Sequence, residues 1–538
     1  LAVVHKGQHA EGIVVDVQSH VTVERVRVCG VAGHGVLVRV DSSLTATDLL
    51  VDGTNYLNAE VLGGMGIWLD TNAKATLRRV RLSHNRSFGA GAFALSTLHA
   101  ERLAIEHLRP AAGQSPVSIG LTSAGAVSKV VASAVRIDDV FGIAVQSSDD
   151  GADLKLTHAA IERTASFTVD DSLTTALGVY DAATATVRSV YIEDSKGAGV
   201  HVDRKGSKLE LEDVVIHHVR NTAAKGGGYG IHLGSGVELT LRRVYIGDVV
   251  EAGILSDFDG AKVDVSGLVI DGVADNPDEI GPAKGIFAFR SVFNIVGARI
   301  EHCAGVGLAL TDPTAAAVLS DVRIAHTLDD AAGTVGVAIV GRASAKFTAA
   351  GLVADDSRGV AIVFADQGTT FVGDGVRVDH TGARAIDQGG GHAVYAALGA
   401  NVTLRGCVLS DNLASGFAAD NATLTVDRCV VRRTRFGALV TPERQLGAKL
   451  ADGLVVVGNS IVSMQRSMLL DNARAGVLLD GPSATNVEAT LIVGGIFGIA
   501  TQNGATLLRK AVATAQQSVA ATASDQGLAV PKAPVPGL

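Results

Sequence analysis

The chain has 538 residues, a formal charge of −9, 63 glycines, 10 prolines, one tryptophan and only 4% aromatic residues. A mean hydropathy of +0.30 with 19% charged residues excludes a disordered chain, and dispersed basic residues under a net negative charge exclude nucleic acid as a partner. No apolar run approaches the roughly 18 residues of a membrane-spanning helix, so we expect no membrane span.

One short sequence motif typical of a β-strand recurs along the chain, as in VERVRV, LRRVRL and VRSVYI. Its last apolar residue falls at Val28, Val51, Leu82, Ile105, Ile137, Ile161, Ile192, Ile216, Ile246, Ile270, Ile300 and Ile324. The gaps alternate between 23 or 24 and 30 to 32 residues, so the true period is about 54 residues and contains two unequal units. The units continue less regularly through Val378, Leu409, Val431 and Leu469.

Each unit opens with a Gly-apolar-x-apolar phrase, such as Gly35-Val36-Leu37-Val38 or Gly199-Val200-His201-Val202. Two further short alternating runs follow, and such runs are typical of strands with one buried face. Three strands in about 23 residues leave no room for a helix. The pattern therefore predicts an all-β chain: a single parallel β-helix (solenoid) of about 18 coils, with three short strands per coil, alternating short and long coils, and a spacing of about 4.8 Å between coils.

This fold explains the composition, because aliphatic ladders fill a narrow core in which bulky rings would break the stacking. We predict that the β-helix spans residues 1–504. Residues 505–522 (ATLLRKAVATAQQSVAAT) are predicted to form a short amphipathic capping helix, and the Ala/Pro-rich residues 523–538 a tail or linker. No equivalent cap is visible before Gly12, which favours a missing N-terminal segment over a partner that covers this end.

Asn85, Asn412 and Asn472 each stand four residues before an opening glycine, where stacked side chains can hydrogen-bond along the coils. With these positions and its coil pattern, the chain resembles the right-handed parallel β-helix repeat proteins of the pectate-lyase-like superfamily over residues 12–504. The resemblance implies a right-handed β-helix. It does not imply one activity, since this superfamily includes lyases, hydrolases, epimerases, tailspikes and adhesins.

The long units carry their extra residues at one corner, at 53–65, 108–117, 163–177, 220–229, 272–284, 327–335 and 382–391. We expect these loops to stack as a ridge. Its candidate ligand-binding carboxylates are Asp170, Asp171, Asp275, Asp278, Asp329, Asp330 and Asp387. Oxygen-rich loops suit Ca²⁺, but no Ca²⁺ motif repeats, and we favour solvated loops that cover apolar positions. No other cofactor is indicated.

Histidine recurs two positions after the aliphatic ladder, at His84, His107, His218, His302, His326 and His380. His84 with His107, or His302 with His326, are possible metal ligands, although a corner that prefers polar residues explains the column better. Four cysteines are too few for a disulfide framework and match no metal-ligand spacing. Cys407 and Cys429 occupy the same slot, so a disulfide is geometrically possible; we favour two buried thiols.

Catalytic signatures of the superfamily are incomplete. Gly33-His34-Gly35 and Asp149-Asp150 stand in the reverse of the polygalacturonase order. They lie about 20 Å or more apart by coil spacing, whereas glycoside hydrolysis needs carboxylates within about 10 Å. Trp68 and Asp70 reproduce only part of a pectate-lyase calcium strand.

We therefore favour a non-catalytic, extracellular or cell-surface β-helical scaffold or adhesin-like rod, with polysaccharide or another surface protein as its partner. The alternatives are a divergent polysaccharide lyase, hydrolase or epimerase, and a fibre subunit that associates end to end.

Overall fold

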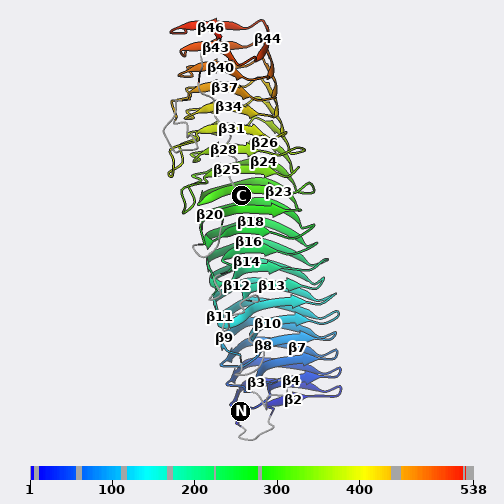
Figure 1. Ribbon diagram of the computed structural model, residues 1–538. Coiled ribbons are helices and arrows are strands. Elements are labelled where there is room, and N and C mark those ends of the chain that lie inside the picture. The colour runs from blue at the N-terminus through cyan, green and yellow to red at the C-terminus, as the bar shows by residue number, and fades with distance from the viewer. Residues whose placement is uncertain are drawn as a thin grey trace. The chain divides into compact units, whose positions relative to one another are not determined.

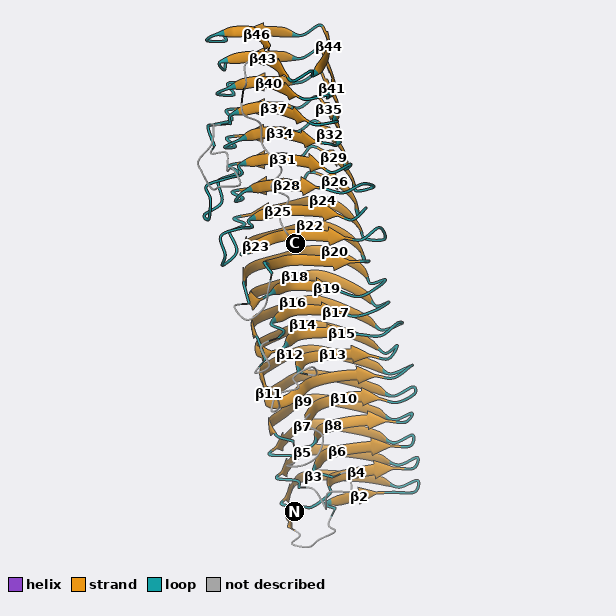
Figure 2. Cartoon of the chain, viewed as in Figure 1, coloured by secondary structure: helices purple, strands orange, loops and turns teal. Residues whose placement is uncertain are grey.

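The computed structural model describes residues 2–4, 11–55, 63–110, 118–165, 174–222, 226–276, 281–437, 450–524 and 528. The chain divides into two compact units, Leu1–Val263 and Asp264–Leu538. The described ranges contain β-strands and no helix (Figure 2), and loops join the strands in chain order (Figure 1). The described residues hold no helix that is long and apolar enough to cross a bilayer.

Two parallel sheets, named sheet A and sheet B, make up the first unit. Sheet A contains β1 (Ala2–Val4), β3 (His20–Cys29), β5 (Ser43–Asp52), β7 (Lys74–Ser83), β9 (Thr97–Leu108), β12 (Asp153–Ala165), β14 (Thr184–Lys196), β16 (Lys208–Arg220) and β18 (Glu238–Val250). Sheet B contains β2 (Ile13–Val15), β4 (His34–Arg39), β6 (Met65–Asp70), β8 (Phe88–Phe93), β10 (Ser118–Ala124), β13 (Thr175–Tyr180), β15 (Ala198–Val202), β17 (Tyr229–Leu233) and β19 (Ala252–Ser256). The long strand β11 (Lys129–Ser148) runs through both sheets.

The second unit also contains two parallel sheets, named A and B as in the first unit, and β20 (Lys262–Ala274) contains the boundary between the units. Sheet B contains β21 (Ala283–Phe289), β23 (Gly305–Thr311), β25 (Val337–Arg342), β28 (Val360–Phe364), β31 (His392–Ala397), β34 (Ser415–Asp420), β37 (Asp452–Val457), β40 (Ala475–Asp480), β43 (Phe497–Gln502) and β46 (Ala520–Ser524). Sheet A contains β22 (Val292–Cys303) and β24 (Ala316–Ala325), and then pairs of shorter strands. These are β26 (Lys346–Ala350), β27 (Val353–Asp355), β29 (Thr370–Asp374), β30 (Arg377–Asp379), β32 (Asn401–Arg405), β33 (Val408–Ser410), β35 (Thr423–Asp427), β36 (Val430–Arg432), β38 (Ile461–Gln465), β39 (Met468–Leu470), β41 (Ala484–Glu488), β42 (Leu491–Val493), β44 (Thr506–Lys510) and β45 (Ala513–Ala515).

In each coil, a left-handed residue bends sheet A between its two main strand segments. Arg25 and Asp213 hold this position inside β3 and β16, both with φ of 55°. In the second unit Gly351 and Gly375 hold it, with φ of 67° and 62°, and there the bend separates two short strands. Each coil therefore has three strand segments, one in sheet B and two in sheet A, as the sequence predicts.

The recurring aliphatic residues of the sequence are register partners in neighbouring strands of sheet A. Val28 pairs with Val51, and the pairing continues through Leu82, Ile105, Ile137, Ile161, Ile192, Ile216 and Ile246. In the second unit it runs from Ile300 through Ile324, Ala354, Val378, Leu409 and Val431 to Leu469. Nearly all of these side chains are fully buried. The predicted parallel β-helix and its alternating coil lengths are confirmed.

The expectation that rings would break the core is wrong for the second unit. Phe293, Phe364 and Phe371 are fully buried, and Phe364 stacks on Phe371 with 4.5 Å between ring centroids. Glycines give these rings their space: a Cβ on Gly341 would lie 2.5 Å from the Phe364 ring, and one on Gly373 would lie 2.9 Å from the Phe371 ring. The core therefore accepts a ring where the neighbouring position has no side chain.

The predicted capping helix over 505–522 is also wrong. These residues form β44, β45 and most of β46, which pair in parallel with β41, β42 and β43. Ala511 and Gln516 have φ of 52° and 61°, which ends any helical path there. A complete backbone ladder on the preceding coil thus overrides the weak helix preference of an Ala-rich segment, and the coils continue beyond residue 504 to Ser524.

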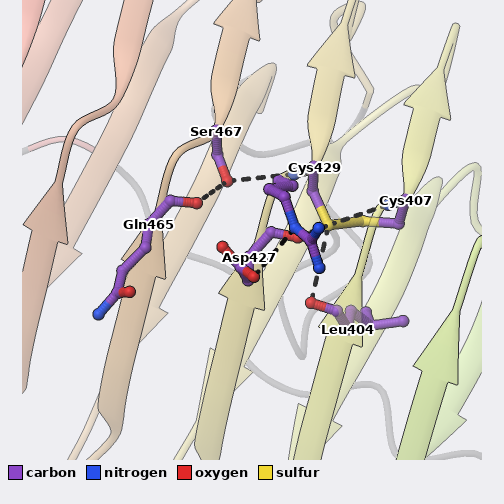
Figure 3. The surroundings of a disulfide bond; sticks show 7 residues. Leu404, Cys407, Asp427, Cys429, Gln465 and Ser467 are labelled. Atoms are coloured by element: carbon purple, nitrogen blue, oxygen red, sulfur yellow. Dashed lines mark hydrogen bonds and ion pairs between the residues drawn. A yellow bond between two sulfur atoms is a disulfide. The ribbon is translucent and has the colours of Figure 1, made fainter.

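Cys407 and Cys429 form a disulfide, with 4.5 Å between their Cα atoms, so the preference for two thiols is wrong. Both stand directly after the left-handed bend of neighbouring coils, where side chains face inward. Figure 3 shows this bond beside Ser467, whose hydroxyl accepts from Cys429 N at 3.2 Å and donates to Gln465 O at 2.7 Å.

Candidate functional site

The loops of the predicted acidic ridge bind one another in the second unit. Asp275 accepts hydrogen bonds from Ala283 N at 2.7 Å and from Ala331 N in the loop of the next long coil. Asp329 repeats this contact one long coil further, where it accepts from Ala385 N at 2.8 Å. The two contacts are equivalent in register, so these carboxylates connect successive loops.

The other two described carboxylates of the ridge close their own loops. Asp330 accepts from Thr334 N at 2.5 Å and from Val335 N at 3.1 Å. Asp387 accepts from Arg384 Nη2 at 2.7 Å and from Gly389 N at 2.8 Å. A ligand-binding role for these residues stays a prediction. Asp170, Asp171 and Asp278 lie outside the described residues.

The histidine column is a column of left-handed residues. His84, His107, His302 and His326 have φ between 52° and 55°, a conformation in which His, Asp and Asn are enriched among non-glycine residues. The two proposed pairs do stack, with ring centroids 5.0 and 5.1 Å apart. Each Nδ1, however, lies 2.7 to 3.0 Å from an aspartate on a neighbouring coil, so this nitrogen of each ring already has a partner.

The asparagine side chains accept hydrogen bonds from threonines of neighbouring coils, as predicted. Asn85 Oδ1 accepts from Thr54 Oγ1 at 2.8 Å, and Asn412 Oδ1 accepts from Thr381 Oγ1 at 2.7 Å. Asn472 repeats the contact with Thr434 at 2.7 Å. These buried side chains therefore hold corners of the coils together.

Sheet B of the first unit carries an aromatic cluster whose members are far enough apart in the sequence that their contact was not predicted. Trp68 stacks on Phe93 with 3.6 Å between ring centroids, and Phe88 meets Trp68 edge-on at 5.6 Å. Ile67 and Leu69, on either side of Trp68, are fully buried, so Trp68 lies on the outer face of the sheet. A Cβ on Gly91 would lie 2.6 Å from the Phe93 ring, so this glycine lets the ring lie close to the strand.

A second cluster lies on the same outer face. Tyr180 Oη is 3.5 Å from His201 Nδ1, the His201 ring stacks on His232 at 4.8 Å, and His232 Nε2 is 3.0 Å from Asp257 Oδ1. Burial, assisted by the neighbouring His232, lowers the pKa of His201 to about 4. Burial also raises the pKa of Tyr180. At neutral pH this cluster thus presents a neutral imidazole beside a protonated phenol.

Register connects the two clusters into one surface. Trp68, Gly91, Thr122, Gln146, Gly178, His201 and His232 are successive partners across sheet B. We name this row the sheet B track. Five coil steps of about 4.8 Å place Trp68 and His201 about 24 Å apart, with only small or polar side chains between them.

A cavity of about 470 Å³ lies on sheet B of the second unit. Lys284 and Phe287 line it, and the Lys284 ammonium lies 5.5 Å from the ring centroid. Across the cavity, Arg342 Nε is 3.2 Å from Asp366 Oδ2. The cavity therefore combines apolar walls with the Lys284 ammonium and the ion pair of Arg342 and Asp366.

Parallel strands stacked coil upon coil around aliphatic ladders define a parallel β-helix protein. The chain belongs to the family described as Right handed beta helix region, which matches residues 175–374 and 360–529. No curated protein matches the sequence.

Solved structures with this fold are similar at low identity. One is the catalytic domain of a GH87 α-1,3-glucanase in complex with tetrasaccharides, at 11% identity over 69% of this chain and 63% of that chain, with a TM-score of 0.31. Others are the PL6 alginate lyase AlyGC, at 9% identity over 95% and 96% with a TM-score of 0.20, and a chain of the Vag8–C1 inhibitor complex, at 10% identity over 96% and 100% with a TM-score of 0.24. The chain spans less than two thirds of the glucanase structure. These likenesses extend to the fold alone.

Proposed function

We propose that the protein is a non-catalytic, surface-exposed or secreted β-helical scaffold that binds a polysaccharide along the sheet B track of its first unit. The observation that carries this proposal is the placement of two aromatic clusters on one row of register partners, with small residues between them. Half-buried rings offer apolar contact to sugar faces, and histidine and tyrosine offer hydrogen bonds.

An extracellular location belongs to this proposal. The disulfide between Cys407 and Cys429 supports it, because disulfides persist in oxidising compartments and are rare in the cytosol. The ion pairs that run from coil to coil, such as Arg79 Nε to Asp48 Oδ1 at 2.6 Å and Arg243 Nε to Asp213 Oδ1 at 2.6 Å, are consistent with a structural role for much of the remaining surface.

The single tryptophan provides a direct test, because Trp68 lies on the proposed track. We expect soluble polysaccharides that retard the protein in affinity electrophoresis to change its tryptophan emission. Trp68→Ala and Tyr180→Ala should each weaken binding about tenfold, as for loss of one ring contact of about 1.4 kcal/mol. Tyr191→Ala, which removes an exposed ring from sheet A, is the matched control and should bind normally. Undiminished binding by the Trp68→Ala, Tyr180→Ala double variant would refute the track.

A second candidate function rests on the Tyr180, His201 and His232 cluster. A neutral histidine held beside a phenol suits removal of the proton α to a uronate carboxylate, the first step of epimerisation or β-elimination. Asp257 would orient His232 in that arrangement. Two readouts test it: solvent deuterium incorporation at C5 of uronate polymers, followed by NMR, reports epimerisation, and the ultraviolet absorbance of a 4,5-unsaturated uronate reports β-elimination. Either signal, if His201→Ala abolishes it, would replace the scaffold with an enzyme, and neither signal over long incubation would leave binding alone.

A further inference from the structure

Two adjacent histidines on β16 face the same side of the strand. Neighbouring side chains in a strand normally point to opposite faces. His218, however, has a φ of 55°, and this left-handed residue turns its side chain beside that of His217, with 4.1 Å between the ring centroids. Glu193, on β14 of the preceding coil, is the register partner of His217 and lies next to both rings.

The three side chains are close without being hydrogen-bonded to one another. Glu193 Oε1 is 3.9 Å from His217 Nδ1 and 3.8 Å from His218 Nδ1, beyond the range of an N–H···O bond. The donor atoms of this set all lie within 4.8 Å of one another, and it is the only such set of three His, Cys, Asp or Glu in the described ranges. Ligands of a tetrahedral Zn²⁺ at about 2.0–2.1 Å lie about 3.4 Å apart, so the two distances from Glu193 to the histidines would shorten by about half an ångström on binding.

A further carboxylate orients one of these rings. His218 Nε2 lies 2.6 Å from Asp248 Oδ2, and Arg220 Nη2 donates to the same oxygen at 2.7 Å. A proton on Nε2 leaves the lone pair of His218 on Nδ1, which faces Glu193. A histidine held by an outer carboxylate in this way is the usual arrangement around a protein-bound metal ion. Asp194 Oδ1, 3.7 Å from His218 Nδ1, adds an oxygen on the solvent side.

The other histidines of the column provide an internal contrast. His302 Nδ1 lies 2.7 Å from Asp271 and His326 Nδ1 lies 3.0 Å from Asp356. Among the described residues, no third His, Cys, Asp or Glu joins these two rings in a three-ligand set like that around Glu193. The Glu193 set also remains accessible, since its three side chains are 30% to 38% exposed.

The geometry points to a binding site for a divalent transition-metal ion of the Zn²⁺ class, with His217 Nδ1, His218 Nδ1 and a Glu193 carboxylate oxygen as ligands. Two imidazoles and a carboxylate match the nitrogen and oxygen preference of Zn²⁺. The fourth position is left to water, Asp194 or an external ligand. This site lies on sheet A and is independent of the sheet B track.

The test uses the full chain, freed of metal by chelator dialysis and titrated with Zn²⁺ against a chromophoric chelator. We expect one equivalent to bind. The variants His217→Ala, His218→Ala and Glu193→Gln should each weaken binding at least tenfold, and Asp248→Asn should weaken it about tenfold or more through loss of orientation. Tetrahedral Co²⁺ absorption bands that disappear in Glu193→Gln would report the same site spectroscopically.

The matched control is the His302→Ala, His326→Ala double variant, which removes two histidines of the same column and should bind one equivalent with unchanged affinity. If a histidine variant unfolds, as judged by circular dichroism, Glu193→Gln decides, because it preserves side-chain shape. Equal Zn²⁺ affinity in the native chain and Glu193→Gln, or loss of binding in the control alone, would overturn the site.

Discussion

At the scale of single residues, Arg474 and Asp452 form a deeply buried ion pair. Their side chains are 6% and 0% exposed, and Arg474 Nε donates to Asp452 Oδ1 at 2.9 Å. Arg474→Met would leave a buried carboxylate without its counter-charge. We expect a local loss of about 3–5 kcal/mol, measured by hydrogen exchange at the amides of β37 and β40.

A similar pair at the surface provides the control for that measurement. Arg466 donates to Asp427 at 2.6 Å, but its side chain is 60% exposed. Arg466→Ala should therefore cost less than about 1 kcal/mol. Equal losses in the two variants would show that burial does not set the importance of these ion pairs.

A buried histidine should make stability depend on pH. His392 is 2% exposed and lies 2.7 Å from Ser415 Oγ, and burial, followed by the charge of Arg384, lowers its pKa to about 4. Below its unfolded pKa of about 6.5, the unfolded chain binds a proton that the folded chain does not. This contribution is thus complete above pH 6.5 and is lost as the pH falls toward 4.

The expected loss is about 3 kcal/mol across that window, at 1.36 kcal/mol per pKa unit. The free energy of unfolding of His392→Gln should lack this component, so its difference from the native chain should change between pH 7 and pH 4. Denaturant unfolding at a series of pH values measures it. A constant difference would mean that His392 is not neutral in the fold.

At the scale of elements, the disulfide fastens two neighbouring coils of the second unit. It closes a segment with a sequence separation of 22, for which chain entropy gives about 3 kcal/mol. Since solenoid stability is largely a sum of coil and interface contributions, we expect the Cys407→Ala, Cys429→Ala variant to lose protection from hydrogen exchange mainly in β32 to β36. Exchange in β3 and β5 serves as the control, and equal loss there would contradict local stabilisation.

The strands also show which parts of the fold can be predicted from the sequence. The aliphatic positions from Val28 to Ile246 match the observed pairing because every coil repeats the same inward slot. The strands after residue 505 could not be predicted from their own composition, which is rich in alanine. They form because they pair with strands of the preceding coil. Some contacts join residues of neighbouring coils that are far apart in the sequence, so no short motif predicts them. Examples are Trp68 with Phe93 and Glu193 with His218. The histidine column does mark His218 as a corner residue, but strand alternation predicts that His217 and His218 point apart, and only the positive φ of His218 brings their rings together.

At the scale of the whole molecule, each coil depends on register with the coils on either side. His158, Ser189 and Asp213 occupy equivalent left-handed positions in three successive coils of the first unit, with φ of 53°, 54° and 55°. A deletion of residues 158–212 joins Thr157 to Asp213 and removes one long and one short coil. Every ladder on both sides of the junction then stays in register.

We expect this deletion to yield a folded, soluble protein with the β-rich circular dichroism of the parent. The matched control removes residues 158–211 and joins Thr157 to Glu212, so that the chain is longer by one residue. Because side chains alternate between faces, this single step moves the inward residues after the junction to the outside unless the chain bulges. We expect it to be less stable and prone to aggregation, as measured by thermal unfolding and size-exclusion chromatography. Equal stability of the two deletions would show that register between coils does not hold the fold together.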